Sequence, residues 1–96
     1  MESLSPIIKW FNRLNYEVVE KGFHSAKIIV FVEGFDPENI IIRAKDKYIY
    51  VYASDDNGET YSMTCRLWFR ITKIKKTIKN GILTLELKGA RLFWII

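Results

Sequence analysis

Cysteine, histidine and proline are scarce in this chain, whose 96 residues include one cysteine, one histidine and two prolines. The single cysteine, Cys65, excludes an intrachain disulfide bond and a zinc site built from several cysteines, and it favours an intracellular protein. No apolar run reaches the length of a membrane span, and Glu2 stands where a secretory signal has basic residues. The sequence therefore predicts a cytoplasmic protein with no membrane association.

Patterns that carry enzyme chemistry are also missing. His24 is the sole histidine, and the sequence has no HExxH motif, no GxSxG motif and no glycine-rich phosphate loop. Asp55 and Asp56 are adjacent carboxylates, but neighbours at a hairpin tip point apart and are ordinarily solvated. Cys65 lies among apolar residues of a strand pattern, so we expect an inert core thiol. We predict that the protein is not an enzyme and binds no cofactor and no metal ion.

Apolar residues, in contrast, are plentiful. Hydrophobic residues make up 49% of the chain and aromatic residues 15%, which is typical of a packed domain with apolar surface to spare. A chain of 96 residues has room for a single domain. The net charge is +4, from 15 lysines and arginines and 11 acidic residues, and it permits contact with nucleic acid without requiring it.

The first residues predict a short amphipathic helix. Ser5 suits the N-cap and Pro6 the first helical position. Apolar residues then recur at spacings of three and four, at Ile7, Trp10, Phe11, Leu14 and Val18. We expect a helix from about Pro6 to Asn15, within an N-terminal arm of residues 1–24. Two roles fit the arm: it covers an open face of the domain, or it is an exposed segment that binds other proteins. A membrane-surface helix fits less well, because the helix is short and Glu17 and Glu20 are close.

From residue 27 the apolar period changes to two, which indicates β-strands. Ile28, Val30 and Val32 alternate with Ile29 and Phe31. Further strand patterns occupy residues 40–44, 48–53, 60–68 and 82–88.

Tight turns separate these strand patterns. Asn-Gly pairs at 57–58 and 80–81 are strong hairpin signals. Residues 70–79, RITKIKKTIK, are ambiguous, because the isoleucines have a helical spacing while the lysines and threonines alternate as in an edge strand. A helix between two hairpins is the poorer fit. About six short strands with tight turns predict an all-β antiparallel sandwich or barrel.

A run of cations suggests an alternative function. Five cations follow one another without an intervening acid, at Arg70, Lys73, Lys75, Lys76 and Lys79. They suit a solvated sheet edge that resists pairing with another chain. With Tyr48, Tyr50 and Tyr52 they could instead form a basic groove with stacking rings for single-stranded nucleic acid. The modest net charge argues against a dedicated nucleic-acid binder.

The order of the strand motifs resembles the α-crystallin domain of small heat shock proteins. The first half of that domain is matched by Gly34, Phe35, Pro37, Glu38 and Ile40, within KIIVFVEGFDPENIIIRAKDKYIYVYAS. NGILTL at residues 80–85 resembles the family's most specific signature, an NGVLTV-like strand. The resemblance covers about residues 26–88. It implies an immunoglobulin-like β-sandwich over residues 25–89 and a short apolar tail over residues 90–96.

The resemblance also implies a binding groove. In the family, a groove between the isoleucine strand and the strand before the Asn-Gly turn takes apolar tail residues, and the matching positions here are Ile41, Arg43, Thr77 and Ile78. A sandwich buries one face of each sheet. The other face, with Ile41 and the tyrosines, therefore needs a cover: the arm, the tail, another subunit or a client protein.

The chain departs from the family pattern at residues 55–58. Archaeal and bacterial members carry there a long loop whose extra strand is exchanged in the dimer, whereas this chain has a short hairpin. Strand exchange is therefore in doubt, and the hairpin is closer to that of p23-like relatives of the same sandwich or of animal crystallins. We expect a homodimer or a small homo-oligomer.

These features predict an ATP-independent chaperone, a holdase that captures partly unfolded client proteins by apolar burial. The residues expected to bind clients lie in the arm, the groove and the tail: Ile7, Ile8, Trp10, Phe11, Leu14, Ile41, Ile78, Leu92, Phe93 and Trp94. A p23-like adaptor with one defined partner and the nucleic-acid binder are the alternatives. The salt dependence of binding distinguishes the nucleic-acid binder from apolar capture, because phosphate binding weakens steeply with salt.

Overall fold

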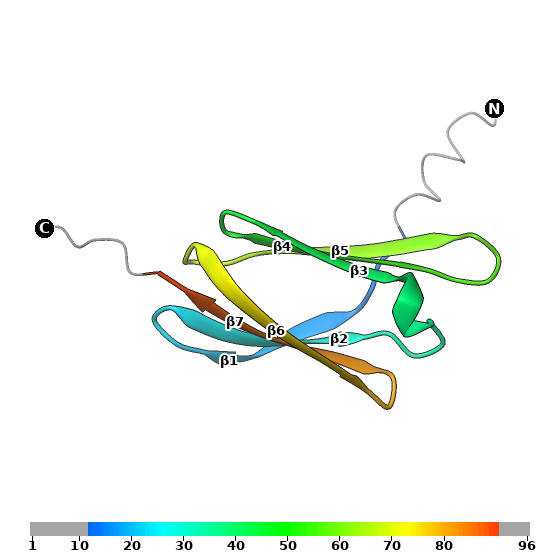
Figure 1. Cartoon of the computed structure of the whole chain (residues 1–96), viewed down its shortest axis with the longest axis horizontal. Coiled ribbons are helices and arrows are strands. Elements are labelled where there is room, and N and C mark those ends of the chain that lie inside the picture. The colour runs from blue at the N-terminus through cyan, green and yellow to red at the C-terminus, as the bar shows by residue number, and fades with distance from the viewer. Residues whose placement is uncertain (1–11, 91–96) are drawn as a thin grey trace, which may run out of the picture.

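The computed structural model describes residues 12–90, which form two antiparallel sheets packed face to face (Figure 1). The four-stranded sheet consists, in spatial order, of β1 (Tyr16–Lys21), β2 (Ser25–Phe31), β7 (Ile82–Gly89) and β6 (Ile71–Lys79). The three-stranded sheet consists of β3 (Ile40–Lys45), β4 (Tyr48–Ser54) and β5 (Thr60–Arg66). A single 3₁₀ turn, η1 (Pro37–Asn39), precedes β3. The predicted all-β sandwich is confirmed.

The core lies between the two sheets. In β2, β4 and β7 every second residue is buried, because the pleat of a strand sends alternate side chains to opposite faces. The largest fully buried side chains are Phe69, Ile28, Ile49, Leu83, Leu85, Leu87, Val30, Val32 and Val51. The predicted alternation is therefore confirmed, and the row of Ile28, Val30 and Val32 is the one that faces the core.

Both Asn-Gly pairs form hairpin turns. In the β6–β7 turn Asn80 and Gly81 have φ of 54° and 78°, the left-handed values that a tight hairpin turn requires. In the β4–β5 turn the Asp55 carboxylate accepts hydrogen bonds from the backbone N–H groups of Asn57 and Glu59, both at 2.9 Å. Asp55 therefore shapes the turn.

The ambiguous segment at residues 70–79 is an edge strand. β6 pairs with β7 from Ile71 opposite Gly89 to Lys79 opposite Ile82. One face of β6, with Ile74, Lys76 and Ile78, lies opposite the buried leucines of β7, and the other face carries Lys73, Lys75 and Lys79. Lysines on an exposed edge discourage pairing with other chains.

The N-terminal part of the sandwich differs from the sequence-based prediction. Residues 12–15, predicted as the end of a helix, form no helix, and Arg13 makes a parallel bridge with Ser62 of β5. Residues 16–21, assigned to the arm, form β1, which pairs with β2. The rest of the predicted helix lies outside the described residues. The spacing from Leu14 to Val18 suits a helix, but it also equals two strand periods.

Gly89 is required by packing at the end of β7. A Cβ atom at this position would meet the ring of the buried Phe69 and lie 2.5 Å from the carbonyl oxygen of Arg70. We expect Gly89→Ala to lower the free energy of unfolding by about 1–3 kcal/mol, the usual cost of overpacking. Urea denaturation measures this loss, with Lys88→Ala as the exposed control. Equal midpoints for the two variants would contradict the prediction.

Candidate functional site

One long side of the sandwich, between the edge strands β1 and β5, is closed by the chain itself. Leu14 donates its backbone N–H to the carbonyl oxygen of Ser62 at 2.9 Å, and Ser62 donates to the carbonyl oxygen of Asn12 at 3.1 Å. The chain then crosses from β5 to β1, and Leu14, 5% exposed, joins the core. Residues 12–16 therefore seal this side.

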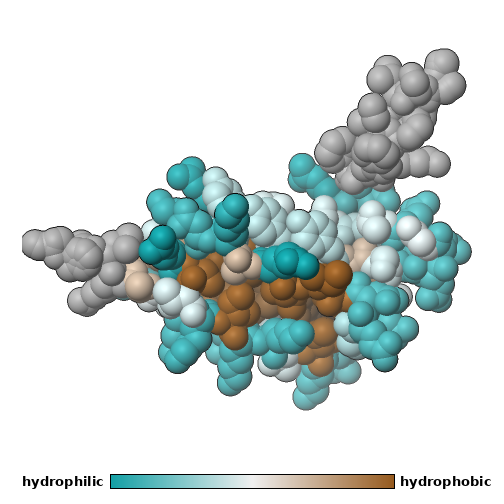
Figure 2. Space-filling model, turned by 45° about the horizontal axis from the view of Figure 1, so that its top comes forward, coloured by the Kyte–Doolittle hydropathy of each residue, from teal (hydrophilic) through white to brown (hydrophobic). Residues whose placement is uncertain are grey.

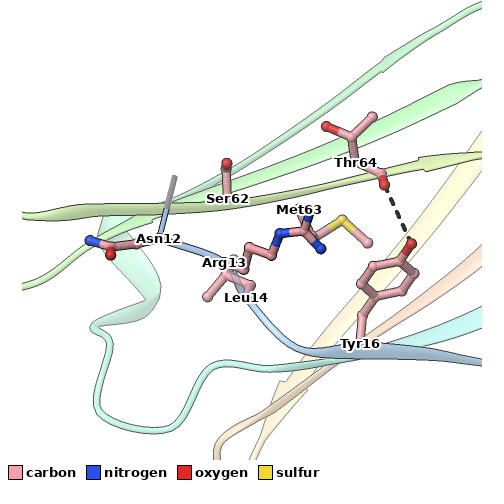
Figure 3. A pocket seen from close by; sticks show the side chains of 7 residues that line it. All are labelled: Asn12, Arg13, Leu14, Tyr16, Ser62, Met63 and Thr64. Carbon is pink, nitrogen blue, oxygen red and sulfur yellow. Dashed lines mark hydrogen bonds between the residues drawn. The ribbon is translucent and has the colours of Figure 1, made fainter. Parts of the chain in front are cut away.

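A cavity of about 330 Å³ lies along the closed side (Figure 3). Its lining comes from the crossing segment and from β5: Asn12, Arg13, Leu14, Tyr16, Ser62, Met63 and Thr64. The Tyr16 hydroxyl donates to the carbonyl oxygen of Thr64 at 3.4 Å. Burial raises the pKa of Tyr16, and the neighbouring Cys65 raises it further. The cavity contains no charged pair that would suit catalysis among the residues that line it.

Cys65 is buried, as expected. Burial raises the pKa of its thiol above the ordinary value of 9.0, and contact with the Tyr16 hydroxyl offsets part of this rise. Because the thiolate is the reactive form, we expect Cys65 to react with Ellman's reagent far more slowly in the folded protein than in denaturant at neutral pH. A Thr64→Cys, Cys65→Ser variant places the thiol on the exposed neighbouring position and should react fast. Equal rates for the two folded proteins would contradict the prediction.

The opposite side, between the edge strands β3 and β6, has no such seal among residues 12–90. Pairing with buried residues of β4 turns Ile42 and Ala44 of β3 inward. Pairing with buried leucines of β7 places Ile74, Lys76 and Ile78 of β6 on the inward side. These five residues line what we call the β3–β6 groove. Ile74 remains 39% exposed although it faces the interior side.

The ends of the β3–β6 groove are defined by contacts between the two sheets. At one end Ile71 donates its backbone N–H to the carbonyl oxygen of Asp46 at 2.9 Å, which ties β6 to the β3–β4 turn. At the other end Phe35 packs against the core and against Tyr61, with ring centroids 5.1 Å apart. Figure 2 shows a band of hydrophobic side chains along the molecule, bordered above and below by hydrophilic ones. The groove combines exposed apolar side chains with two strand edges, the combination that binds extended peptide segments.

The predicted groove residues lie partly elsewhere. Ile41 is opposite Tyr52 on the outer face of the three-stranded sheet and is 50% exposed. Arg43 shares that outer face, and Thr77 lies on the outer face of the four-stranded sheet. Only Ile78 of the four predicted positions lines the groove. A shift by one residue moves a side chain to the other face of a strand, so on β3 the neighbours of the predicted positions, Ile42 and Ala44, are the lining residues.

The other predicted client-binding residues fall into two groups. Leu14 is a core residue and its placement in an exposed arm is wrong, because the chain crosses between the sheets at this point. The remaining ones lie outside the described residues: Ile7, Ile8, Trp10, Phe11, Leu92, Phe93 and Trp94.

The tyrosines and the lysine run do not form one groove. Tyr48, Tyr50 and Tyr52 stack along the outer face of the three-stranded sheet, with successive ring centroids 6.2 and 6.5 Å apart. Lys73, Lys75 and Lys79 pair with residues on the outer face of the four-stranded sheet. These three lysines and the tyrosines therefore lie on opposite outer faces of the sandwich, and Lys76, opposite the buried Leu85, faces the β3–β6 groove. This separation removes the geometric basis of the predicted nucleic-acid groove.

Two further properties concern residues 12–90. Within this range no three His, Cys, Asp or Glu side chains come together as a metal site would require. Nor does the described part contain a helix long and apolar enough to cross a membrane.

No family model matches the sequence. No curated protein matches it either. Solved structures do match the fold. Heat shock protein 16.0 from Schizosaccharomyces pombe has a TM-score of 0.70 and 15% identity, over 83% of this chain and 68% of that chain. HSP18.5 from E. histolytica has a TM-score of 0.69 and 13% identity, over 88% of this chain and 94% of that one. A small heat shock protein from Synechococcus phage S-ShM2 has a TM-score of 0.66 and 13% identity, over 81% and 88%.

Proposed function

Because this chain has the α-crystallin-type fold of small heat shock proteins, we propose that it is an ATP-independent holdase that binds partly unfolded proteins. The observation that carries the proposal is the β3–β6 groove, in which Ile74 is exposed and Ile42 and Ile78 are only half-buried. Such exposure has a cost in a monomer and is typical of a binding surface. The protein acts in the cytoplasm, on client proteins that expose apolar segments.

Binding in the groove uses apolar burial, without covalent chemistry. A client segment in extended conformation covers Ile74 and Ile78 from β6 and Ile42 from β3, and its backbone pairs with a strand edge. Full burial of one aliphatic side chain contributes about 1.5–3 kcal/mol, so a few partly exposed residues give a weak and reversible complex. Reversible binding keeps the client from aggregating and lets it leave without ATP.

The arm and the tail extend the proposed client-binding surface. The tail residues follow Ala90, whose backbone N–H donates to the carbonyl oxygen of Arg70 at 3.3 Å, next to the Ile71 end of the groove. Leu92, Phe93 and Trp94 therefore begin within a few residues of the groove. In the arm, Ile7, Ile8, Trp10 and Phe11 precede the segment that seals the closed side.

Light scattering of a heat-aggregating model protein tests the holdase function. The assay compares samples with and without this chain at near-stoichiometric ratio, without nucleotide, at low and at moderate salt. We expect suppression of scattering that persists with salt, because apolar burial is not screened as charge contacts are. A folded sample that gives no suppression at either salt concentration would contradict the proposal.

A dedicated adaptor of the p23-like type is the second candidate. The observation that favours it is the β4–β5 connection, in which Asp55 and Glu59 close a short hairpin with a backbone bond of 3.0 Å. This hairpin has no additional strand that could be exchanged in a dimer. An adaptor would leave model clients unprotected and bind one partner with defined stoichiometry, which pull-down from its own cell lysate followed by titration would measure.

A further inference from the structure

Charged residues separate along the long axis of the sandwich. At one end lie the β1–β2 loop, the β3–β4 turn, residues 67–70 and the end of β7 (left in Figure 1). Backbone bonds hold these segments together, from Leu67 to Lys47 at 2.7 Å and from Gly89 to His24 at 2.7 Å. This basic end carries Lys21, Lys45, Lys47, Arg66, Arg70 and Lys88. Its Asp46 is paired with Arg70 at 3.5 Å.

The opposite end is acidic. It contains the β2–β3 connection with η1, the β4–β5 hairpin and the β6–β7 turn (right in Figure 1). A backbone bond of 2.9 Å from Val32 to Gly81 and the contact between the Phe35 and Tyr61 rings hold these segments together. This acidic end carries Glu33, Asp36, Glu38, Asp55, Asp56 and Glu59.

The basic end also presents an exposed aromatic side chain, that of Phe23. Phe23, at the tip of the β1–β2 loop, is 91% exposed, more than any other large hydrophobic residue of the described chain. The loop is braced, because the indole N–H of Trp68 donates to the carbonyl oxygen of Gly22 at 2.8 Å. The Lys21 Nζ lies over the Trp68 ring, 5.9 Å from the ring centroid, and Lys21 is two residues from Phe23 in the chain. Phe23 is therefore held out from the surface and flanked by positive charge.

The acidic end has a matching cavity. It has a volume of about 560 Å³, enough to admit an aromatic side chain. Its lining is partly apolar, with Val32, Phe35, Pro37 and Ile78. Glu33 and one cation, Lys79, also line it, and Asp36 and Glu38 flank Pro37 in the chain. The cavity thus offers an apolar site with acidic residues at its rim.

We propose that the basic end of one copy docks on the acidic end of a second copy, with Phe23 in the cavity between residues 32–37 and 78–81. Both halves of the contact are on the same chain and are complementary in charge and in apolar character, which favours and orients association. The contact is heterologous, so repetition gives rings or open chains rather than a two-fold dimer. An anionic membrane would use the basic end alone and leave the acidic cavity without a role. The proposal does not require the holdase function, but the cavity shares Ile78 with the β3–β6 groove, so a docked second copy would cover one end of that groove.

Sedimentation velocity of the full chain at low and high ionic strength tests this contact. We expect self-association at low ionic strength that weakens in high salt. Two charge-reversed variants, Lys21→Glu with Lys88→Glu and Asp36→Lys with Glu38→Lys, should each self-associate about tenfold or more weakly. An equimolar mixture of the two variants should regain association, because the unaltered acidic end of the first variant then meets the unaltered basic end of the second. A folding defect could not be repaired by mixing.

Phe23→Ser tests the apolar part of the contact. Its exposed position in a loop makes a folding defect unexpected, and we expect self-association to fall about tenfold, as for a central aromatic anchor. Phe31→Ser, an exposed position on the outer face of the four-stranded sheet, is the matched control and should leave association unchanged.

Four results would overturn the proposal: a monomer at every salt concentration, association that is indifferent to both charge reversals, failure of the mixture to regain association, or equal effects of Phe23→Ser and Phe31→Ser. Binding of the wild type to phosphatidylserine vesicles without self-association would assign the basic end to a membrane instead.

Discussion

Replacing Ile74 by glutamate is expected to remove most of the client protection, so that about tenfold more protein is needed to suppress the same scattering. Ile74 faces the β3–β6 groove and is 39% exposed, so a client would bury it. The glutamate loses that burial and places a carboxylate where the client's apolar residues would desolvate it. Because Ile74 lies on an edge strand and is partly exposed, the free energy of unfolding should change by about 1 kcal/mol or less.

Ile41→Glu is the matched control for this experiment. Ile41 is 50% exposed but lies on the outer face of the three-stranded sheet. Light scattering with both variants, at equal and verified foldedness, compares the groove with the outer face. We expect protection by Ile41→Glu to remain close to wild type. If Ile41→Glu removes protection and Ile74→Glu keeps it, clients bind the outer face, as the sequence first suggested, and the groove is not the site.

Leu14→Ala is expected to lower the free energy of unfolding by about 2–5 kcal/mol, the range for a large-to-small substitution in a core. Leu14 is 5% exposed and belongs to the core cluster, where it fills the side between β1 and β5. Urea denaturation monitored by circular dichroism measures the loss. For a domain of this size such a loss is a large fraction of total stability.

Val19→Ala provides the control for Leu14→Ala, since Val19 lies in the next strand along the chain and is exposed at a bulge of β1. It should change the free energy of unfolding by about 0.5 kcal/mol or less. Deletion of residues 1–11 should also leave the fold stable, whereas deletion of residues 1–15 should destabilise it as Leu14→Ala does. If Leu14→Ala unfolds at the same urea concentration as wild type, the sealed side contributes nothing to stability.

Much of the fold could be predicted from the sequence, because local chemistry determines it. The two Asn-Gly pairs define hairpins, and strict alternation in residues 27–32 and 82–88 defines which side chains enter the core. β1 could not be predicted in the same way. Val18, within the β1 sequence YEVVEK, follows Leu14 at a spacing that suits both a helix and a strand. Only the pairing of β1 with β2 decides between the two structures.

The residues that line the candidate groove could not be predicted in detail. The sequence indicated a groove beside the isoleucine strand, yet Ile41 and Ile42 differ only in which side of the strand they occupy. Ile74 was hidden in a run of lysines, because its exposure depends on where the two sheet edges end in space. The charge separation between the ends was also invisible in the sequence, since it arises from loops that are distant along the chain and adjacent in the sandwich.

Under the proposed function, the seal formed by residues 12–16 limits how many clients one copy would hold. Because one side of the sandwich is occupied by its own chain, a single copy offers a single open side, the β3–β6 groove. β6 has nine residues and spans roughly 30 Å at the usual rise of a strand, so the groove accommodates one short extended segment of a client. Capacity should therefore scale with the number of copies present, and a long unfolded chain should need several of them at once to stay soluble.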